Sequence, residues 1–423
     1  MHLTFSSFVK AIQRWSIPHK RRCARGHIAA PDDGSIQILI EATPNYLNVG
    51  DLAMLQVSVA RLRSIWPQAR ITVFTTDAER LQLRCPGLLS VPAGTRSLWF
   101  RHRSANISAA EAQAENPATR ELLIDFACQL KKMNLFVISG MGSYHDAGGQ
   151  HAVDMLDTIR LMRSLGVPGV AFSQGIGPID KSSIVWSAAQ RSLPCLEFIA
   201  LREARSGPAL LRELGVASDR FLVTGDDAIE CAYRERPPSL SHLLGLNLRV
   251  AFYSGITTGE AQRLSSLFQA IAQGLGATLI PAPISFVPGE SDLDTFAHMF
   301  PGHTAVAALD SIQTTPEWAI EEIGRCRMVI TGAYHAAVFA LSQGIPAICI
   351  QRSAYYRDKF LGLAAQFGNF GCQVIAVDEP DFESRIRNTA EDMWHMADRY
   401  RKPLLRAAAK QIRDSKAAWA ELS

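Results

Sequence analysis

Five short segments of the sequence carry polar or charged side chains that could bind an anion or transfer a proton. In chain order they are Asn48-Val-Gly50-Asp51, Ser139-Gly140-Met-Gly142-Ser-Tyr144, Gln174-Gly175-Ile-Gly177-Pro178, Leu201-Arg202-Glu203 and Thr331-Gly332-Ala-Tyr334-His335. Glycines let backbone N–H groups approach an anion closely. The planar guanidinium of Arg202 can hold a carboxylate or phosphate through two parallel hydrogen bonds. His335 would lie in a first helical turn, where the helix dipole favours a bound anion.

These segments lie at turns between predicted strands and helices, because short apolar runs alternate with amphipathic segments along the chain. Leu52, Leu55, Val59 and Leu62, for example, form one helical face directly after Asp51. Repeated alternation predicts parallel sheets with helices on both faces, and such sheets bind ligands at the carboxyl ends of their strands. We predict strands over 36–41, 71–75, 135–139, 169–173, 198–201, 221–224, 248–253, 278–281, 305–307, 328–331, 347–350 and 374–377.

The alternation is poorly defined over 76–130, which we expect to be a long excursion carrying a helix. The Pro-rich polar stretch 234–238 lies between two alternating regions and predicts a linker between two domains. We therefore expect a basic N-terminal arm over 1–33, an N-terminal α/β domain over 34–236 and a C-terminal α/β domain over 237–380. A final helix over 381–423 is long enough to pack back on the first domain. The predicted fold class is α/β, with two doubly wound, Rossmann-like domains facing a cleft in a glycosyltransferase-B-like arrangement.

Composition and charge exclude several classes of protein. An apolar fraction of 48% and a charged fraction of 20% are typical of a folded globular chain, so wholesale disorder is excluded. The net charge of +3 is too small to make nucleic acid the expected partner. Residues 1–30 hold six Lys or Arg and no acidic residue. This basic arm could contact an anionic inner membrane surface, or it could be a mobile tail.

Neither the cysteines nor the apolar runs predict a metal site or a membrane span. The eight cysteines contain no CxxC pair, which argues against a zinc ribbon or a redox dithiol. Lys10 and Arg14 interrupt the first apolar stretch, so we expect no signal peptide, and no apolar run reaches eighteen residues. The His145, Asp146, His151 and Asp154 group could in principle ligate a metal, but such loop clusters are usually solvated. We expect no metal and a reduced, soluble, cytoplasmic protein.

The order of these segments along the chain is more specific than any one of them. Together with Gly225-Asp226-Asp227-Ala, Gly344-Ile-Pro346 and Tyr356-Arg-Asp-Lys359, it resembles the polysaccharide pyruvyl transferase family from about residue 36 to about residue 371. The resemblance implies transfer of the enolpyruvyl group of phosphoenolpyruvate to a sugar, usually as a cyclic ketal. The acceptor would be a cell-surface polysaccharide or its lipid-linked oligosaccharide precursor. No cofactor is implied beyond phosphoenolpyruvate as the donor substrate.

From the residues and the resemblance together we predict which side chains act. His335 would contact the phosphate or transfer a proton, Arg202 would hold an anionic group, and Asp51 would line the cleft as a third catalytic residue. The predicted substrate-binding residues are Asn48, Gly50, Gly140, Gly142, Tyr144, Gly175, Gly177 and Lys359.

One departure from the family pattern leaves two alternatives open. The family usually has Gly-Arg-Leu-His, whereas this chain has Gly332-Ala333-Tyr334-His335 and so lacks that arginine. Arg352 or Arg357 could join Arg202 and Lys359 in replacing its charge. One alternative is a nucleotide-sugar glycosyltransferase of the same fold. The other is a non-catalytic member of a polysaccharide assembly complex, which the missing arginine favours.

Overall fold

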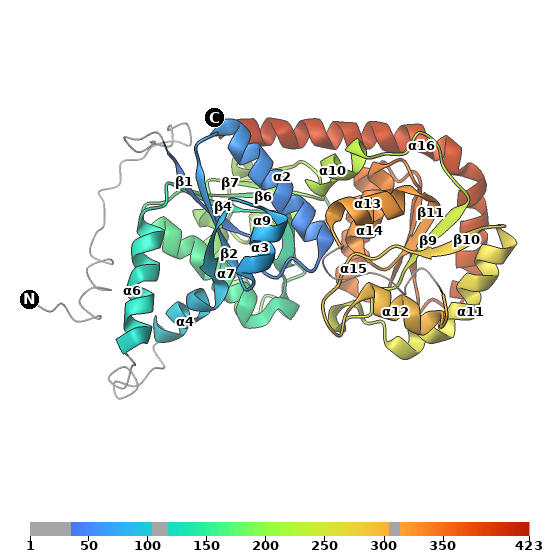
Figure 1. Cartoon of the computed structure of the whole chain (residues 1–423), viewed down its shortest axis with the longest axis horizontal. Helices are drawn as coiled ribbons and strands as arrows, with labels where there is room; N and C mark the ends of the chain where they lie inside the picture. Colours follow the sequence, from blue (N-terminus) through green and yellow to red (C-terminus); the bar gives the residue numbers. More distant parts are fainter. Residues whose placement is uncertain (1–34, 104–116, 304–313, 423) are drawn as a thin grey trace, which may run out of the picture.

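Two parallel β-sheets form the framework of the protein (Figure 1). The computed structural model describes residues 35–103, 117–303 and 314–422. The predicted N-terminal arm (1–33) and the predicted strand over 305–307 lie outside the described residues. The pairings between named strands are all parallel in both sheets. This confirms the predicted α/β class of two doubly wound units.

The first sheet has the strand order β3-β2-β1-β4-β6-β7-β8, with β5 paired to β6. Its central strands β1, β4 and β6 are buried along almost their whole length, as expected for strands covered on both faces. Its strands are β1 (Gln37–Glu41), β2 (Arg70–Thr75), β3 (Leu89–Pro92), β4 (Leu135–Ile138), β5 (Met141–Tyr144), β6 (Gly169–Ile176), β7 (Phe198–Leu201) and β8 (Phe221–Val223). Its helices are α2 (Val49–Ile65), α3 (Ala78–Arg84), α4 (Ala93–Arg103), α6 (Pro117–Lys131), α7 (Gly149–Ser164), α8 (Ile184–Ser192), α9 (Gly207–Glu213) and α10 (Ala228–Arg234).

The second sheet has the order β10-β9-β11-β12-β13. Its strands are β9 (Leu243–Asn247), β10 (Thr278–Pro281), β11 (Cys326–Thr331), β12 (Ala347–Gln351) and β13 (Cys372–Ala376). The helices of this half are α11 (Thr258–Gly274), α12 (Asp292–Met299), α13 (Pro316–Gly324), α14 (Tyr334–Ser342) and α15 (Ala354–Gln366), followed by α16 (Phe382–Ala420).

Three strand assignments differ from the sequence-based prediction. The first strand of the second sheet is 243–247, so the prediction of 248–253 is wrong. Gly245 explains the error, because an interior glycine weakens a strand pattern. In the structure a Cβ at Gly245 would come within 2.9 Å of the Cys326 sulfur, so the close approach of a neighbouring strand requires glycine there. The edge strand β3 and the short β5 were not predicted, since neither contains a continuous apolar run.

The last helix, α16, runs along both halves of the molecule and ends beside the first sheet (Figure 1). Near its start, Ile386 and Met393 are buried in the cluster that covers the second sheet. Near its end, the Trp419 ring stacks on Phe172 of β6, with ring centroids 3.7 Å apart. The helix therefore joins the two halves of the molecule through buried apolar contacts.

In each sheet the strand order reverses next to the first strand. This happens at β1 and β4 in the first sheet, and at β9 and β11 in the second. Connections on the two sides of such a point leave in opposite directions, so the carboxyl ends of the strands border an open crevice. The loops after β1, β4, β9 and β11 are therefore the places where a ligand site is expected.

Candidate functional site

A cavity of about 200 Å³ lies between the two sheets at the carboxyl ends of their strands. Both halves of the molecule contribute side chains to it, and most come from the loops at which the strand order reverses. From the first half it is lined by Asn48, Asp51, Gly142, Ser143, His145 and Arg202. From the second half it is lined by Arg249, Tyr253, Ile284, Tyr334, His335, Tyr355, Tyr356 and Lys359.

The N-terminus of α2 forms one wall of the cavity and is tied to the other half of the molecule. Asn48 is the N-cap, with its side-chain oxygen accepting from Gly50 N at 3.0 Å and Asp51 N at 3.3 Å. Val49 N donates to the carbonyl oxygen of Ile284 at 3.0 Å, which crosses between the halves. Asp51 is not the cap. The Asp51 carboxylate accepts a hydrogen bond from the hydroxyl of Thr43 at 2.9 Å, and Asp51 also lines the cavity.

His335 lies in the first turn of α14 between two carboxylates from the other half of the molecule. Its Nε2 is 3.5 Å from Oδ2 of Asp226, and its Nδ1 is 4.0 Å from Oδ1 of Asp51. The side chain is 6% exposed. A Cβ on Gly50 would overlap the imidazole, so glycine at that position is required by the close approach of His335. This arrangement fixes the orientation of the ring, as proton transfer requires.

Asp226 does not line the cavity but contacts two groups that do. It is completely buried, and its Oδ2 lies 3.6 Å from Nη1 of Arg202 as well as 3.5 Å from His335. Burial by itself would raise the pKa of Asp226, but the neighbouring His335 and Arg202 outweigh burial and hold the pKa below its usual value. Asp226 is therefore a buried anion close to two cavity side chains, although its Oδ2 and the His335 Nε2 make no hydrogen bond in the structure. Its motif, Gly225-Asp226-Asp227-Ala, contributed to the family resemblance, but nothing in the local sequence pattern predicts that Asp226 lies at the site.

Arg202 follows β7 and is 2% exposed. Its guanidinium lies over the Tyr334 ring, 4.2 Å from the ring centroid. A Cβ on Gly175 would come within 2.7 Å of its Nε, so this glycine makes room for the arginine rather than for an anion. Among the described residues, Arg202 Nε has no hydrogen-bond partner. A buried donor without a partner is one that a bound anion could satisfy.

Lys359 and Tyr355 lie one turn apart on α15. The Lys359 ammonium donates to the Tyr355 hydroxyl, which donates to the carbonyl oxygen of Gly142 at 3.1 Å. Burial and then the nearby Arg202 charge lower the pKa of Lys359 well below its usual value. Burial, Lys359 and Arg202 also lower the pKa of His145 to about 3. The His145 ring lies 4.6 Å from the Tyr355 ring, measured between centroids.

Arg249 is the cavity cation that sequence analysis missed. It is 2% exposed, and its Nη1 lies 3.0 Å from Oδ1 of the buried Asp292. Its position two residues after β9 matches that of Arg202 directly after β7, so the signal was present in the sequence. The incorrect strand prediction over 248–253 placed Arg249 inside a strand and hid it.

The other arginines suggested as replacements lie outside the cavity. Arg352 pairs with Glu260 at 2.6 Å, and Arg357 contacts Asp358 at 3.5 Å. The backbone N of Arg249, by contrast, would be 3.0 Å from a Cβ at Gly332, the residue before the missing family arginine. Arg249 therefore lies beside the position at which the family pattern has its arginine.

Five of the eight predicted substrate-binding residues do not line the cavity, and three of these, Gly140, Tyr144 and Gly177, are not behind a cavity side chain either. Side chains alternate along a strand, so Ser143 of β5 faces the cavity while Tyr144 is 1% exposed in the core. Gly140 packs against Met54 and Ser173, and Gly177 adopts a φ of +88° beside Leu210. Gly140 therefore serves local packing, and Gly177 serves turn geometry. Of the other predicted residues, Asn48, Asp51, Gly142, Arg202, His335 and Lys359 line the cavity, and Gly50 and Gly175 lie directly behind His335 and Arg202.

The described residues contain no group of three or more His, Cys, Asp or Glu that could hold a metal ion. Asp146, one of the loop residues considered above, accepts a hydrogen bond from the backbone N of Asp180 at 2.7 Å. Within the same described ranges, no helix is both long and apolar enough to cross a membrane.

Solved structures share this architecture at low sequence identity. A protein proposed to be a UDP-N-acetylglucosamine 2-epimerase from Listeria monocytogenes has a TM-score of 0.56 and 10% identity, covering 91% of this chain and 95% of that chain. Staphylococcus aureus MnaA with UDP has a TM-score of 0.53 and 12% identity, with 89% and 94% covered. A UDP-glucosyltransferase from Polygonum tinctorium has a TM-score of 0.52 and 13% identity, with 93% and 99% covered. The fold is thus the two-domain glycosyltransferase-B-like fold, as predicted.

The family follows from the sequence. The polysaccharide pyruvyl transferase model matches residues 48–353, which is well over half of the chain, so the protein belongs to that family of transferases. The match confirms the resemblance seen in the order of the glycine-containing segments. No curated protein sequence matches the chain significantly.

Proposed function

We propose that this protein transfers the pyruvyl unit of phosphoenolpyruvate, as a cyclic ketal, to a sugar of a cell-surface polysaccharide or its lipid-linked precursor. The observation that carries the proposal is the convergence of Arg202, Arg249 and Lys359 on one small cavity that also holds His335. Phosphoenolpyruvate carries a carboxylate and a phosphate, and guanidinium groups bind both through paired hydrogen bonds. No metal or redox cofactor is needed for the reaction.

The size of the cavity supports a small donor. Pockets that hold drug-sized ligands are typically about 300–1,000 Å³, whereas this cavity is about 200 Å³. A nucleoside diphosphate sugar would need considerably more room than phosphoenolpyruvate. The retained cations also argue for a working anion site, and so against a purely non-catalytic role, despite the alanine at position 333.

The proposed reaction adds a proton and two sugar oxygens to phosphoenolpyruvate and releases inorganic phosphate. A proton adds to the methylene carbon of phosphoenolpyruvate while a sugar hydroxyl oxygen bonds to the neighbouring carbon and gives up its proton. The oxygen of a second hydroxyl of the same sugar then bonds to that carbon as the C–O bond to phosphate breaks, and its proton passes to the departing phosphate, which closes the ketal. His335 is placed to transfer one of these protons, with Asp226 beside the ring. Arg202 and Arg249 would hold the carboxylate and phosphate, and Asn48 and Asp51 would contact the acceptor.

A thermal melt with a panel of donors tests the proposal. Phosphoenolpyruvate at a hundred times its dissociation constant should stabilise the protein by about 2.7 kcal/mol, which raises the melting temperature measurably. Phosphate release in the presence of lipid-linked or polymeric sugar acceptors tests turnover. A melt shifted by a nucleoside diphosphate sugar and not by phosphoenolpyruvate would instead support a glycosyltransferase. No shift and no turnover with any donor would support a non-catalytic assembly role.

A contact of residues 1–33 with the inner membrane surface belongs to the same proposal, because a lipid-linked acceptor would be presented there. The observation behind it is the basic run in residues 1–30, which carry six Lys or Arg and no acidic residue. Co-sedimentation with anionic and with neutral vesicles, for the full chain and for a chain without residues 1–33, tests this contact.

A further inference from the structure

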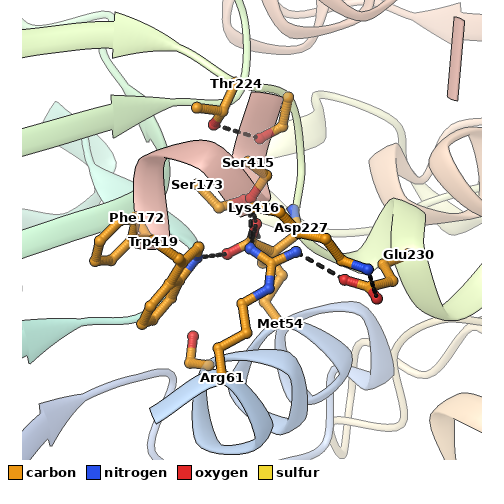
Figure 2. A network of polar contacts seen from close by, with 12 residues as sticks. Met54, Arg61, Phe172, Ser173, Thr224, Asp227, Glu230, Ser415, Lys416 and Trp419 are labelled. Atoms are coloured by element: carbon orange, nitrogen blue, oxygen red, sulfur yellow. Dashed lines mark hydrogen bonds and ion pairs between the residues drawn. The ribbon is translucent and has the colours of Figure 1, made fainter. Parts of the chain in front are cut away.

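The turn between β8 and α10 carries two adjacent carboxylates that face opposite sides. Asp226 faces His335 and Arg202 at the cavity, as described above. Asp227 faces away, toward the end of α16, and is completely buried (Figure 2). Because Asp226 and Asp227 are joined by one peptide bond, contacts that hold Asp227 in place also restrict the position of Asp226.

Asp227 is held by three separate elements (Figure 2). From α2, Arg61 Nη1 lies 3.2 Å from its Oδ1. From β6, the Ser173 hydroxyl accepts a hydrogen bond from its backbone N at 2.9 Å. From α16, the Ser415 hydroxyl donates to Oδ1, and the Trp419 indole N–H donates to Oδ2 at 3.3 Å. A buried carboxylate that loses such partners is strongly destabilised, so these contacts define its position closely.

The contacts from α16 come from one face of the helix. Gln411, Ser415 and Trp419 are spaced by four residues and so lie in a row along it. Gln411 covers the residue before Asp226, since a Cβ on Gly225 would come within 2.5 Å of the Gln411 Oε1. The helix thus contacts the turn on both sides of Asp226. No group of this row reaches the cavity itself.

The same helix also holds the element that carries His335. The first turn of α14 presents His335, and the helix ends at Ser342, with Gln343 as its C-cap. Arg401 of α16 donates to the carbonyl oxygen of Gln343 at 3.2 Å, and its side chain packs against Gly344. Ten residues at a rise of 1.5 Å put Gln411 about 15 Å further along α16 than Arg401. One continuous helix, with Pro403 between these two residues, therefore spans from the α14 end to the Asp226 turn.

We propose that α16 is a brace that sets the distance between Asp226 and His335, and that Ser415, Trp419 and Asp227 are positioning residues for the cavity. Asp226 and His335 come from different halves of the molecule, so their 3.5 Å separation depends on how the halves are held. The inference rests on the proposed function only where turnover is measured. The position of the His335 ring can be measured without any substrate.

The test uses the full-length double variant Ser415→Ala/Trp419→Phe. The change removes both α16 donors to Asp227 and keeps an aromatic ring over Phe172. Trp394→Phe is the matched control, because Trp394 is a buried tryptophan of the same helix packed on the second sheet, away from the turn. If the double variant does not fold, Ser415→Ala and Trp419→Phe are measured singly.

The first measurement is the ring ¹H–¹⁵N spectrum of protein labelled at histidine, with the His335 signals assigned by their loss in His335→Asn. We expect these signals to move in the Ser415→Ala/Trp419→Phe variant and to stay in place in Trp394→Phe. His335 signals identical to wild type in the double and both single variants would overturn the proposal. This outcome does not depend on which donor the enzyme uses.

The second measurement is turnover with the donor identified by the melt. A misplacement of about 1 Å remote from the chemistry can cost about 10²-fold, so we expect kcat to fall by up to that factor while the donor KM changes much less. A fall in activity that only follows the loss of melting temperature, at unchanged His335 signals, would mean that α16 has a purely structural role. Turnover with a nucleotide-sugar donor instead of phosphoenolpyruvate would refute the proposed function. The role of α16 would still be tested by the His335 ring signals.

Discussion

The contact between Gly50 and His335 provides the sharpest perturbation of the site. Gly50 is the second residue of α2, and the His335 ring lies directly against it from the other half of the molecule. A Cβ on Gly50 would overlap Cγ, Nδ1 and Cβ of His335, all at less than the 3.0 Å that real Cβ atoms essentially never show. We predict that Gly50→Ala removes most activity without changing a single polar group.

The magnitude follows from which atoms collide. Rotation of the imidazole relieves an overlap with the ring but not one with the His335 Cβ, which is fixed to the backbone of α14. One of the two helices must therefore shift, and α2 is held to the second half by the hydrogen bond from Val49 N to Ile284 O. A shift of about 1 Å at the site should reduce kcat/KM by about 10²-fold. Overpacking should cost about 1–3 kcal/mol of stability.

Two assays separate these effects, namely donor-dependent phosphate release and thermal unfolding. Gly259→Ala is the matched control, because Gly259 is likewise the second residue of a helix, α11, and a Cβ there meets nothing within 4 Å. Gly259→Ala should keep wild-type turnover and stability. Full turnover in Gly50→Ala at an unchanged melting temperature would refute the contact with His335, and with it the placement of the imidazole.

Three further predictions concern the cavity itself. His335→Asn should lower turnover by about 10²- to 10⁴-fold at a stability cost of about 1 kcal/mol or less; early melting in proportion to lost activity would make His335 a core residue instead. Gly175→Ala should raise the donor KM, because the new methyl group displaces Arg202, and an unchanged KM would remove Arg202 from donor binding. The pKa of Lys359 is lower in the folded protein than its usual 10.5, mainly through burial, so the unfolded chain binds more protons and stability rises with pH below that value. Lys359→Met should therefore stabilise the protein more at about pH 7 than at about pH 10 in urea unfolding; a pH-independent difference would show that Lys359 keeps an ordinary pKa.

Much of the framework was readable from local sequence pattern. The apolar runs at Ile38–Ile40 and Val329–Ile330 are strands buried on both faces, and burial on both faces requires a continuous apolar run. The face formed by Leu52, Leu55 and Val59 packs on the first sheet as its spacing predicts. Because parallel strands place their carboxyl ends at one edge, Arg202 and His335 could each be expected at the ligand-binding edge of its own sheet from its position in the chain.

The partners within the cavity were decided only by the tertiary structure. Arg249 became visible once the packing of β9 against β11 showed that the strand ends at Asn247, a register that a strand interrupted by Gly245 does not reveal. Tyr144 and Ser143 are neighbours in sequence, yet the pleat of β5 sends one into the core and the other to the cavity. Gly50 is a glycine because His335, far away in the chain, needs its space. Local pattern determines which residues form a strand or helix and where it ends, since these depend on neighbours a few positions away. Contacts between the halves form because α16 and the long connections bring together elements that are far apart in the chain. The spacing of neighbouring residues does not show which distant elements meet.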